Sequence, residues 1–291
     1  MLKSQWMPHG ARRARLIAVF LLAAAGIAPA YGDELPPTAT APIASDRGDD
    51  TYQRLINERR SEDPIALREL SQTLMQRAMR SEDSFERWAG LRTARFLRDP
   101  TLAAAARAQL HSGSRYEEAL ALEILQNSDP ENSRSDFIAA LESPYRTVRL
   151  RALRALRPHS DETLVARVSI LATSDSDPDI RVLAVRILQQ WSARGAIAPL
   201  RRGLRDPVPA VQQETVRALV ALGDSELTAM IRQRIETAPP EERVAVLRLA
   251  SLVPRRELLV AIGPFLGDAD VEVRVAAAGA VIAITQTEGH P

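Results

Sequence analysis

Four arginines recur at a nearly constant interval and carry the charge with which this chain could bind a ligand. The interval is 31 or 32 residues, and the four are Arg154, Arg186, Arg217 and Arg248. Arg151 lies one helical turn before the first of them. A guanidinium group donates two parallel hydrogen bonds to a carboxylate, phosphate or sulfate. The pattern predicts a binding row for an anionic partner, and a merely solvated helix face is the alternative.

Residue types that build most active sites and metal sites are scarce. The chain has no cysteine, and no two of its four histidines lie three or four residues apart. Thiolate chemistry and a paired-histidine metal site are therefore excluded. No serine-histidine-aspartate motif, phosphate loop or zinc motif is present. We expect no catalytic residue, no metal and no cofactor, and hence no enzymatic activity.

The N-terminus has the three-part pattern of a secretory signal peptide. Arginines within residues 12–15 precede an apolar run, Leu16–Ile27, and small residues follow at Ala30 and Gly32. We predict cleavage after Gly32, with cleavage after Ala30 as the alternative. The mature chain is then periplasmic or secreted. The apolar run is shorter than the roughly 20 residues of a spanning helix, although an uncleaved anchor that tethers the chain to the membrane is a second possibility.

Charge outside this segment is nearly balanced. The first 32 residues hold four basic residues and no acidic one, so the rest of the chain has 34 basic against 37 acidic residues, a net charge of −3. Bulk charge of this kind gives no argument for binding nucleic acid or an anionic membrane.

A repeat of about 31 residues is the strongest pattern in the chain. Its reference position, called position zero, is held by Arg149, Arg181, Gln212, Arg243 and Arg274, with weaker matches at Glu118 and Arg87. Apolar residues recur one residue before position zero and three, four and seven residues after it, which makes one apolar stripe on a helix. A turn rich in Asp, Ser and Pro precedes each such helix.

A second amphipathic segment precedes each turn. These segments are Ser135–Leu141, Leu164–Ala172, Ala196–Leu204, Leu227–Ile235 and Leu258–Leu266. The repeating unit is therefore a helix, a turn and a second helix. One such pair cannot bury its own apolar face, so successive pairs must stack.

In two repeats a turn aspartate stands six residues before the position-zero arginine, as Asp175–Arg181 and Asp268–Arg274. This pattern resembles the HEAT repeat, in particular its short bacterial variety, over roughly residues 80–285. Two repeats depart from it: Gln212 follows Asp206, and Thr237 replaces the aspartate before Arg243. The resemblance implies an all-α, right-handed α-solenoid of HEAT or armadillo type, and usually a protein-binding role.

The helical register assigns different roles to the two sets of arginines. Position zero lies within the apolar stripe, where a charge must be paired. We therefore predict a structural ladder that includes the pairs Asp175–Arg181 and Asp268–Arg274. Five residues after position zero, the arginine row faces solvent, and in a HEAT-like stack it lies on the concave surface.

The chain is thus predicted to have five parts. They are a signal peptide (1–32), a Pro-containing flexible linker (33–52), an N-terminal helical capping region (53–100), HEAT-like repeats (101–285) and a short tail (286–291). We interpret the whole as a non-catalytic scaffold or assembly module of the cell envelope. Its expected partner is another protein with an acidic surface, without nucleic acid and without stable membrane insertion. An accessory subunit of an envelope enzyme and a binder of anionic glycan or lipid headgroups are the alternatives.

Overall fold

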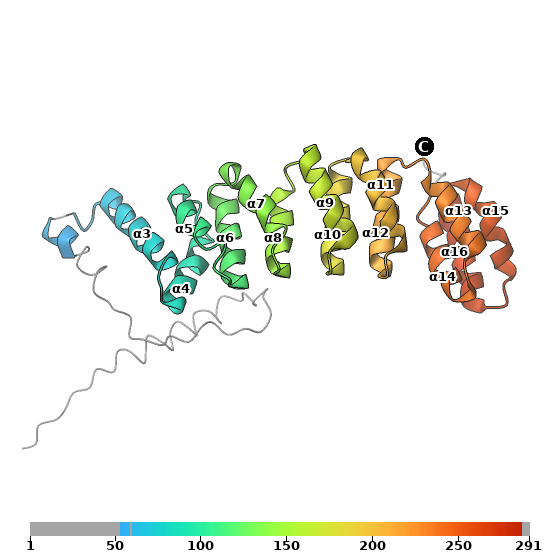
Figure 1. The fold of residues 1–291 in the computed structure, drawn as a ribbon, viewed down its shortest axis with the longest axis horizontal. Helices are drawn as coiled ribbons and strands as arrows, with labels where there is room; N and C mark the ends of the chain where they lie inside the picture. The colour runs from blue at the N-terminus through green and yellow to red at the C-terminus, as the bar shows by residue number, and fades with distance from the viewer. Residues whose placement is uncertain (1–52, 59, 287–291) are drawn as a thin grey trace, which may run out of the picture. The chain divides into compact units, whose positions relative to one another are not determined.

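The structure is a computed structural model, and it describes residues 53–58 and 60–286, which belong to one compact unit. Within these residues the chain is helical and contains no strand. Helix pairs follow one another in a single row from α3 to α16 (Figure 1). The predicted signal peptide, the linker and all but the first residue of the tail lie outside the described residues.

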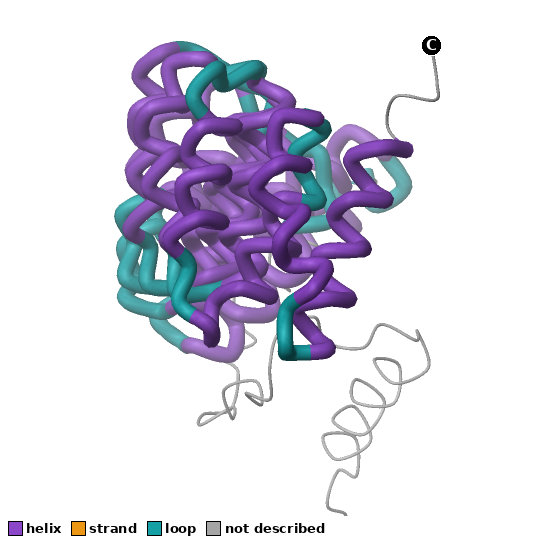
Figure 2. The backbone as a smooth tube through the Cα atoms, turned by 90° about the vertical axis from the view of Figure 1, so that its right-hand side faces the viewer, coloured by secondary structure: helices purple, strands orange, loops and turns teal. Residues whose placement is uncertain are grey.

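Each pair consists of a first helix, a turn and a second helix. The first helices are α3 (Pro64–Met79), α5 (Ala103–Arg107), α7 (Arg134–Ala140), α9 (Glu162–Ser174), α11 (Ile197–Leu200), α13 (Leu227–Thr237) and α15 (Leu259–Ile262). The second helices are α4 (Ser84–Ala94), α6 (Arg115–Ser128), α8 (Arg146–Leu156), α10 (Pro178–Gln190), α12 (Pro209–Leu222), α14 (Arg243–Ala250) and α16 (Val271–Gln286). Viewed nearly along the row, the helices overlie one another and the loops lie at their ends (Figure 2). This arrangement is the predicted α-solenoid of stacked helix pairs.

The helix starts follow from local sequence. Asp177 caps α10, because its side chain accepts hydrogen bonds from the backbone N–H groups of Asp179 and Ile180, and Pro178 occupies the first turn. Asp161 caps α9 in the same way through the N–H of Leu164. These side chains satisfy donors that have no partner within the helix.

Two of the predicted first helices are shorter than their amphipathic segments. Residues 196–204 are divided between the 3₁₀ turn η3 (Arg194–Ala196), α11 and η4 (Arg201–Arg205). Residues 258–266 are divided in the same way between η6 (Arg256–Leu258), α15 and η7 (Gly263–Gly267). Each segment contains a proline, Pro199 or Pro264. Proline lacks an N–H and crowds the preceding turn, so it interrupts a regular α-helix.

The core runs along the row as the apolar stripes of neighbouring pairs meet. Val185, Val216 and Leu247, each four residues after position zero, are 0%, 0% and 1% exposed. Each of them belongs to one continuous cluster of buried side chains that extends from Met79 to Ile284. Stacking between pairs therefore provides the burial that a single pair lacks.

One turn carries backbone strain that can be tested. After α10 the chain reverses through Ser192, whose φ of 51° is in the left-handed region, and the equivalent turn after α12 uses Gly223, with a φ of 73°. Both turns close with the same backbone hydrogen bonds, Ala193 N–H to Leu188 O and Asp224 N–H to Leu219 O. A side chain is disfavoured in this conformation, whereas glycine adopts it freely.

We therefore expect Ser192→Gly to raise the free energy of unfolding by about 0.5–1 kcal/mol. Urea denaturation would measure the change. The matched substitution Gly223→Ser should lower stability by a similar amount. A loss of stability in Ser192→Gly would show that the Ser192 side chain contributes a contact larger than its strain.

Candidate functional site

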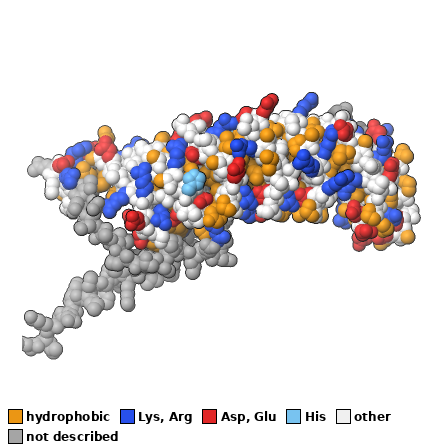
Figure 3. Space-filling view, in the orientation of Figure 1, with side chains coloured by type: hydrophobic (Ala, Val, Ile, Leu, Met, Phe, Trp, Pro, Cys, Tyr) orange, Lys and Arg blue, Asp and Glu red, His pale blue; other side chains and the backbone are white. Residues whose placement is uncertain are grey.

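The second helices place the arginine row where the register predicted. Arg154 on α8, Arg186 on α10, Arg217 on α12 and Arg248 on α14 are all exposed. Blue and red side chains are interspersed over the face shown in Figure 3. The electrostatics of the row therefore depend on the acids that lie beside each arginine.

A buried glutamate neutralises the middle of the row. The carboxylate of Glu214 accepts two hydrogen bonds from Arg186, at 2.9 and 3.2 Å, and one from Arg217 at 3.3 Å. The side chain of Glu214 is only 9% exposed, whereas those of Arg186 and Arg217 are 57% and 50% exposed. These two arginines therefore hold a buried carboxylate in place and leave one net positive charge between them.

The two ends of the row are different. No acidic side chain among the described residues forms an ion pair with Arg154 or Arg248. Burial, together with the like charge of the nearby Arg154, lowers the pKa of the Arg151 guanidinium to about 10. Arg151 stays protonated at neutral pH. The free positive charge of the row is thus concentrated at Arg154 and Arg248.

A second acid that the sequence pattern did not single out lies next to Arg151. Glu123 on α6 is 31 residues before Arg154, at the position that carries arginine in the later repeats. Its carboxylate is 2.9 Å from the guanidinium of Arg151 and 4.0 Å from that of Arg95. Burial raises the pKa of Glu123, and the charge of Arg95 opposes that rise. Counting one repeat back from Arg154 would have revealed this residue.

Two further arginines border this group. The guanidinium carbon of Arg92 lies 4.9 Å from the ring centre of Trp88, and that of Arg95 lies 4.4 Å from the ring centre of Phe96. Burial and the charge of Arg95 lower the pKa of Arg92. Arg95 and Arg151 therefore flank the Glu123 carboxylate, and the like-charged Arg92 and Arg154 lie near them.

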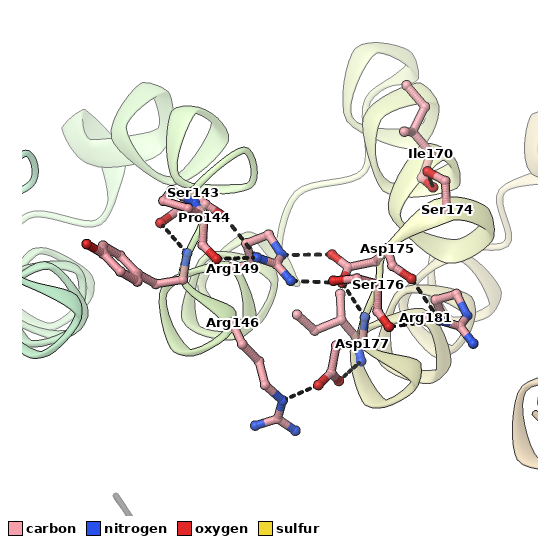
Figure 4. Close-up of polar contacts among 12 residues, drawn as sticks. Ser143, Pro144, Arg146, Arg149, Ile170, Ser174, Asp175, Ser176, Asp177 and Arg181 are labelled. Atoms are coloured by element: carbon pink, nitrogen blue, oxygen red, sulfur yellow. Dashed lines mark hydrogen bonds and ion pairs between the residues drawn. The ribbon is translucent and has the colours of Figure 1, made fainter. Parts of the chain in front are cut away.

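The position-zero arginines form the ladder, but its pairing differs from the prediction. Arg181 donates from Nε and one terminal nitrogen to Asp206 of the next repeat, at 2.7 and 2.9 Å. Its other terminal nitrogen donates to the backbone carbonyl of Asp175 at 2.7 Å. The carboxylate of Asp175 instead accepts two bonds from Arg149 of the preceding repeat, at 2.8 and 2.9 Å (Figure 4). The predicted side-chain pair Asp175–Arg181 was therefore wrong.

The rest of the ladder follows the same offset. Arg243 donates to the carboxylate of Asp268 at 2.9 Å, and Arg274 donates to the backbone carbonyl of Asp268 at 2.8 Å. The predicted side-chain pair Asp268–Arg274 was thus also wrong. Each turn aspartate holds its own turn as well, since Asp206 accepts the N–H of Val208 at 2.8 Å. One aspartate therefore joins two repeats and orders the turn between them.

Glu118 occupies position zero of its repeat, and its carboxylate has no guanidinium partner among the described residues. Glu118 is 7% exposed, and its carboxylate accepts the N–H of Gly113 at 3.2 Å. Burial raises the pKa of Glu118 above 4.5, although that hydrogen bond and His111 act against the rise. A group whose pKa is raised by folding destabilises the fold once the pH exceeds the pKa of the unfolded chain.

We expect Glu118→Gln to raise the free energy of unfolding by about 1 kcal/mol at pH 7. The gain should shrink as the pH falls to about 4, where the unfolded chain also binds the proton. Gln212 shows how an amide fits position zero, because its nitrogen donates to the carbonyl of Asp206. Urea denaturation at both pH values measures the effect. The neighbouring Glu117→Gln is the control: Glu117 pairs with Arg87 at 2.7 Å, so its loss should destabilise.

The arrangement presents exposed guanidinium groups, which can bind anions. Within residues 53–58 and 60–286, no three His, Asp or Glu side chains converge as a metal site would require. None of the helices described has both the length and the apolarity needed to cross a bilayer.

Comparison with known proteins agrees with this architecture. Residues 164–250, which include most of α9 and all of α10 to α14, match the family model for HEAT repeats. The described residues therefore form an α-solenoid, and the stretch 164–250 matches HEAT repeats. No curated protein matches its sequence.

Several solved structures are similar in fold. An engineered protein is 18% identical, and the match covers 74% of this chain and 96% of that one at a TM-score of 0.38. Human deoxyhypusine hydroxylase in complex with glycerol is 16% identical, with 82% and 96% covered and a TM-score of 0.35. The complex of CpcE and CpcF of phycocyanin lyase from Nostoc sp. PCC7120 is 17% identical, with 75% and 88% covered and a TM-score of 0.40.

Proposed function

We propose that this chain is a non-catalytic scaffold of the cell envelope that binds an acidic surface of another protein through the arginine row. The observation that carries the proposal is the uneven neutralisation of the row. Arg186 and Arg217 share the buried Glu214, whereas Arg154 and Arg248 are exposed without an acidic partner among the described residues. An exposed arginine contributes little to stability, so stability does not account for arginine at these two positions.

Two double variants separate binding from stability. Arg154→Gln with Arg248→Gln removes two free charges. Arg186→Gln with Arg217→Gln removes two charges of which Glu214 already compensates one. We expect the first to weaken binding while the melting temperature stays within a few degrees. The second should lower the melting temperature, because it leaves the Glu214 carboxylate buried without a partner, and it should weaken binding less.

The assay begins with affinity capture from envelope extract by the mature chain, followed by binding measurements with the purified partner. Raising the salt concentration should weaken binding as the first double variant does, because exposed charge pairs are screened over about 8–10 Å. Binding that survives the first double variant would place the site elsewhere. Retention of the chain on an anionic polysaccharide, with no stoichiometric protein captured, would favour the glycan-binding alternative.

The envelope location rests on the N-terminal pattern, which lies outside the described residues. The motivating sequence is the arginine, apolar and small-residue order of residues 12–32. Mass spectrometry of the protein from envelope fractions should find a mature N-terminus at Asp33, or at Tyr31 if cleavage follows Ala30. A chain that begins at Met1 and stays in the cytoplasm would refute export.

A further inference from the structure

The last helix of the row has an apolar outer face. Val271, Val275 and Ile282 on α16 are 58%, 67% and 53% exposed. With Ala278 they are spaced by four, three and four residues, which aligns them on one stripe of the helix. We call these four residues the end stripe.

The end stripe overlaps the surface on which the earlier pairs stack: Ala278 lies at a buried stacking position, and Val275 matches the half-buried Val182 and Val244. Ala278 is four residues after position zero, where Val185, Val216 and Leu247 are fully buried in the earlier pairs. Ala278 itself is only half-buried. The stacking interface therefore continues to the last described pair and is left uncovered there by the described residues. Terminal repeats of a solenoid ordinarily turn a polar face outward, and this one does not.

The ladder is also open at this end. Arg149 and Arg181 each make two sets of hydrogen bonds. In the first set, one terminal nitrogen donates to backbone carbonyls of the turn in the same repeat. In the second set, Nε and the other terminal nitrogen donate to the aspartate carboxylate of the next repeat. Arg274 makes the first set of bonds, to the carbonyls of Asp268 and Ala269 at 2.8 and 2.9 Å. No described carboxylate lies within ion-pair distance of its remaining donors. Arg274 is thus oriented by its own turn to receive a carboxylate.

We infer that this end of the solenoid is a docking site for a helical partner that continues the stack. The partner would bring two features: a carboxylate in a turn, which binds Nε and the free terminal nitrogen of Arg274, and an apolar helix face, which covers the end stripe. Within the solenoid, a following repeat provides the same two features to the repeat before it. The ion pairs Arg149–Asp175 and Arg181–Asp206 are the examples.

A second copy of this chain does not supply that carboxylate. The end stripe matches itself in antiparallel fashion when Val271 lies opposite Ile282 and Val275 opposite Ala278. In that register Arg274 faces Gly279 of the second copy, which offers no acid. In a head-to-tail arrangement the turn position of the first pair, six residues before Arg87, is Ser81. The occupant is therefore a different, helical protein with an acidic turn.

An appended repeat serves as the probe for this site. A copy of residues 256–286, inserted directly after Gln286, places an aspartate equivalent to Asp268 and an apolar helix where the partner would dock. We expect the insertion to raise the midpoint of urea unfolding. Two substitutions should each remove part of this gain in stability: Asp→Asn at the inserted aspartate, and Arg274→Gln. Because both break the same ion pair, the double variant should lose no more stability than the more damaging single variant.

Matched substitutions test the end stripe. Val275→Glu should abolish the gain, whereas Val260→Glu, at an 85% exposed position on α15, should leave it unchanged. The inference is overturned if the insertion gives no gain, or if the gain is indifferent to Val275→Glu and Arg274→Gln. Light scattering of the unextended chain should show a monomer; a dimer that Val275→Glu dissociates would assign the face to a second copy and also overturn the inference. The outcome is independent of the arginine row, because none of the row residues is changed.

Discussion

Arg181→Ala should lower the free energy of unfolding by about 3–5 kcal/mol, the typical effect of removing one partner from a buried ion pair. The side chains of Arg181 and Asp206 are 9% and 6% exposed, so water cannot replace the lost guanidinium. The substitution also removes the donor to the carbonyl of Asp175. Urea denaturation followed by circular dichroism measures the change.

Two comparisons make this result specific. Arg154→Ala removes an exposed arginine without an acidic partner and should change stability by less than about 0.5 kcal/mol. Arg186 is unsuitable as this control, because its removal strips a partner from the buried Glu214. In the Arg181→Ala background, Asp206→Asn should cost less than it does alone, since the uncompensated carboxylate has gone. Strictly additive effects would contradict a coupled pair.

Gly90→Ala should destabilise the chain by about 1–3 kcal/mol through overpacking. Gly90 lies within α4, where that helix crosses α3. A Cβ atom at this position would lie 2.9 Å from the backbone nitrogen of Met79 and 3.0 Å from the Cβ of Ala78. Because the obstacle is largely backbone, α3 itself would have to move. Each repeat contacts only its neighbours, so hydrogen exchange should show lost protection mainly in α3 and α4.

The same substitution elsewhere should have the opposite sign. Gly279 lies in the middle of α16, and a Cβ atom there would meet nothing within 4 Å. Gly279→Ala should therefore raise the free energy of unfolding by about 0.5–1 kcal/mol, the helix-propensity difference between the two residues. If both variants were stabilised, the close approach of α3 and α4 would not be rigid.

Local rules determine most of this fold, which is why the sequence predicted it. The apolar residues around position zero have the period of a helix, and Asp177, in the turn predicted before the second helix of its pair, caps α10 in the structure. The predicted segments Leu164–Ala172 and Leu227–Ile235 became α9 and α13 with ends shifted by zero to two residues. Only where proline interrupts a segment, at Pro199 and Pro264, did the apolar period overestimate the helix.

The sequence did not predict which aspartate each position-zero arginine binds. That pairing depends on distances between neighbouring repeats, and the pattern within one repeat gives no information about them. A spacing of six residues between Asp175 and Arg181 fits a bond to the aspartate's own carbonyl as well as to its carboxylate, and only the stacked structure shows that the carboxylate binds Arg149. Glu214 was missed for the same reason. It lies two residues after position zero, where the other repeats carry unrelated residue types, and reaches Arg186 across the repeat boundary.

The departure of Gln212 and Thr237 from the ladder has a consequence for how the row of helices can flex. Between α12 and α14 the turn side has no arginine–aspartate rung, because Gln212 bonds only to the carbonyl of Asp206. On that side Arg234 donates to the backbone carbonyl of Leu204 in place of the rung. At the other end of the helices Arg201 binds the carboxylate of Asp224 at 2.9 Å. A bond to a neutral carbonyl is weaker than an arginine–aspartate ion pair, so this interface opens most easily along its turn side. Its opening would change the separation of Arg217 and Arg248, so that one half of the arginine row could adjust to the spacing of charges on a partner while the other half stays fixed.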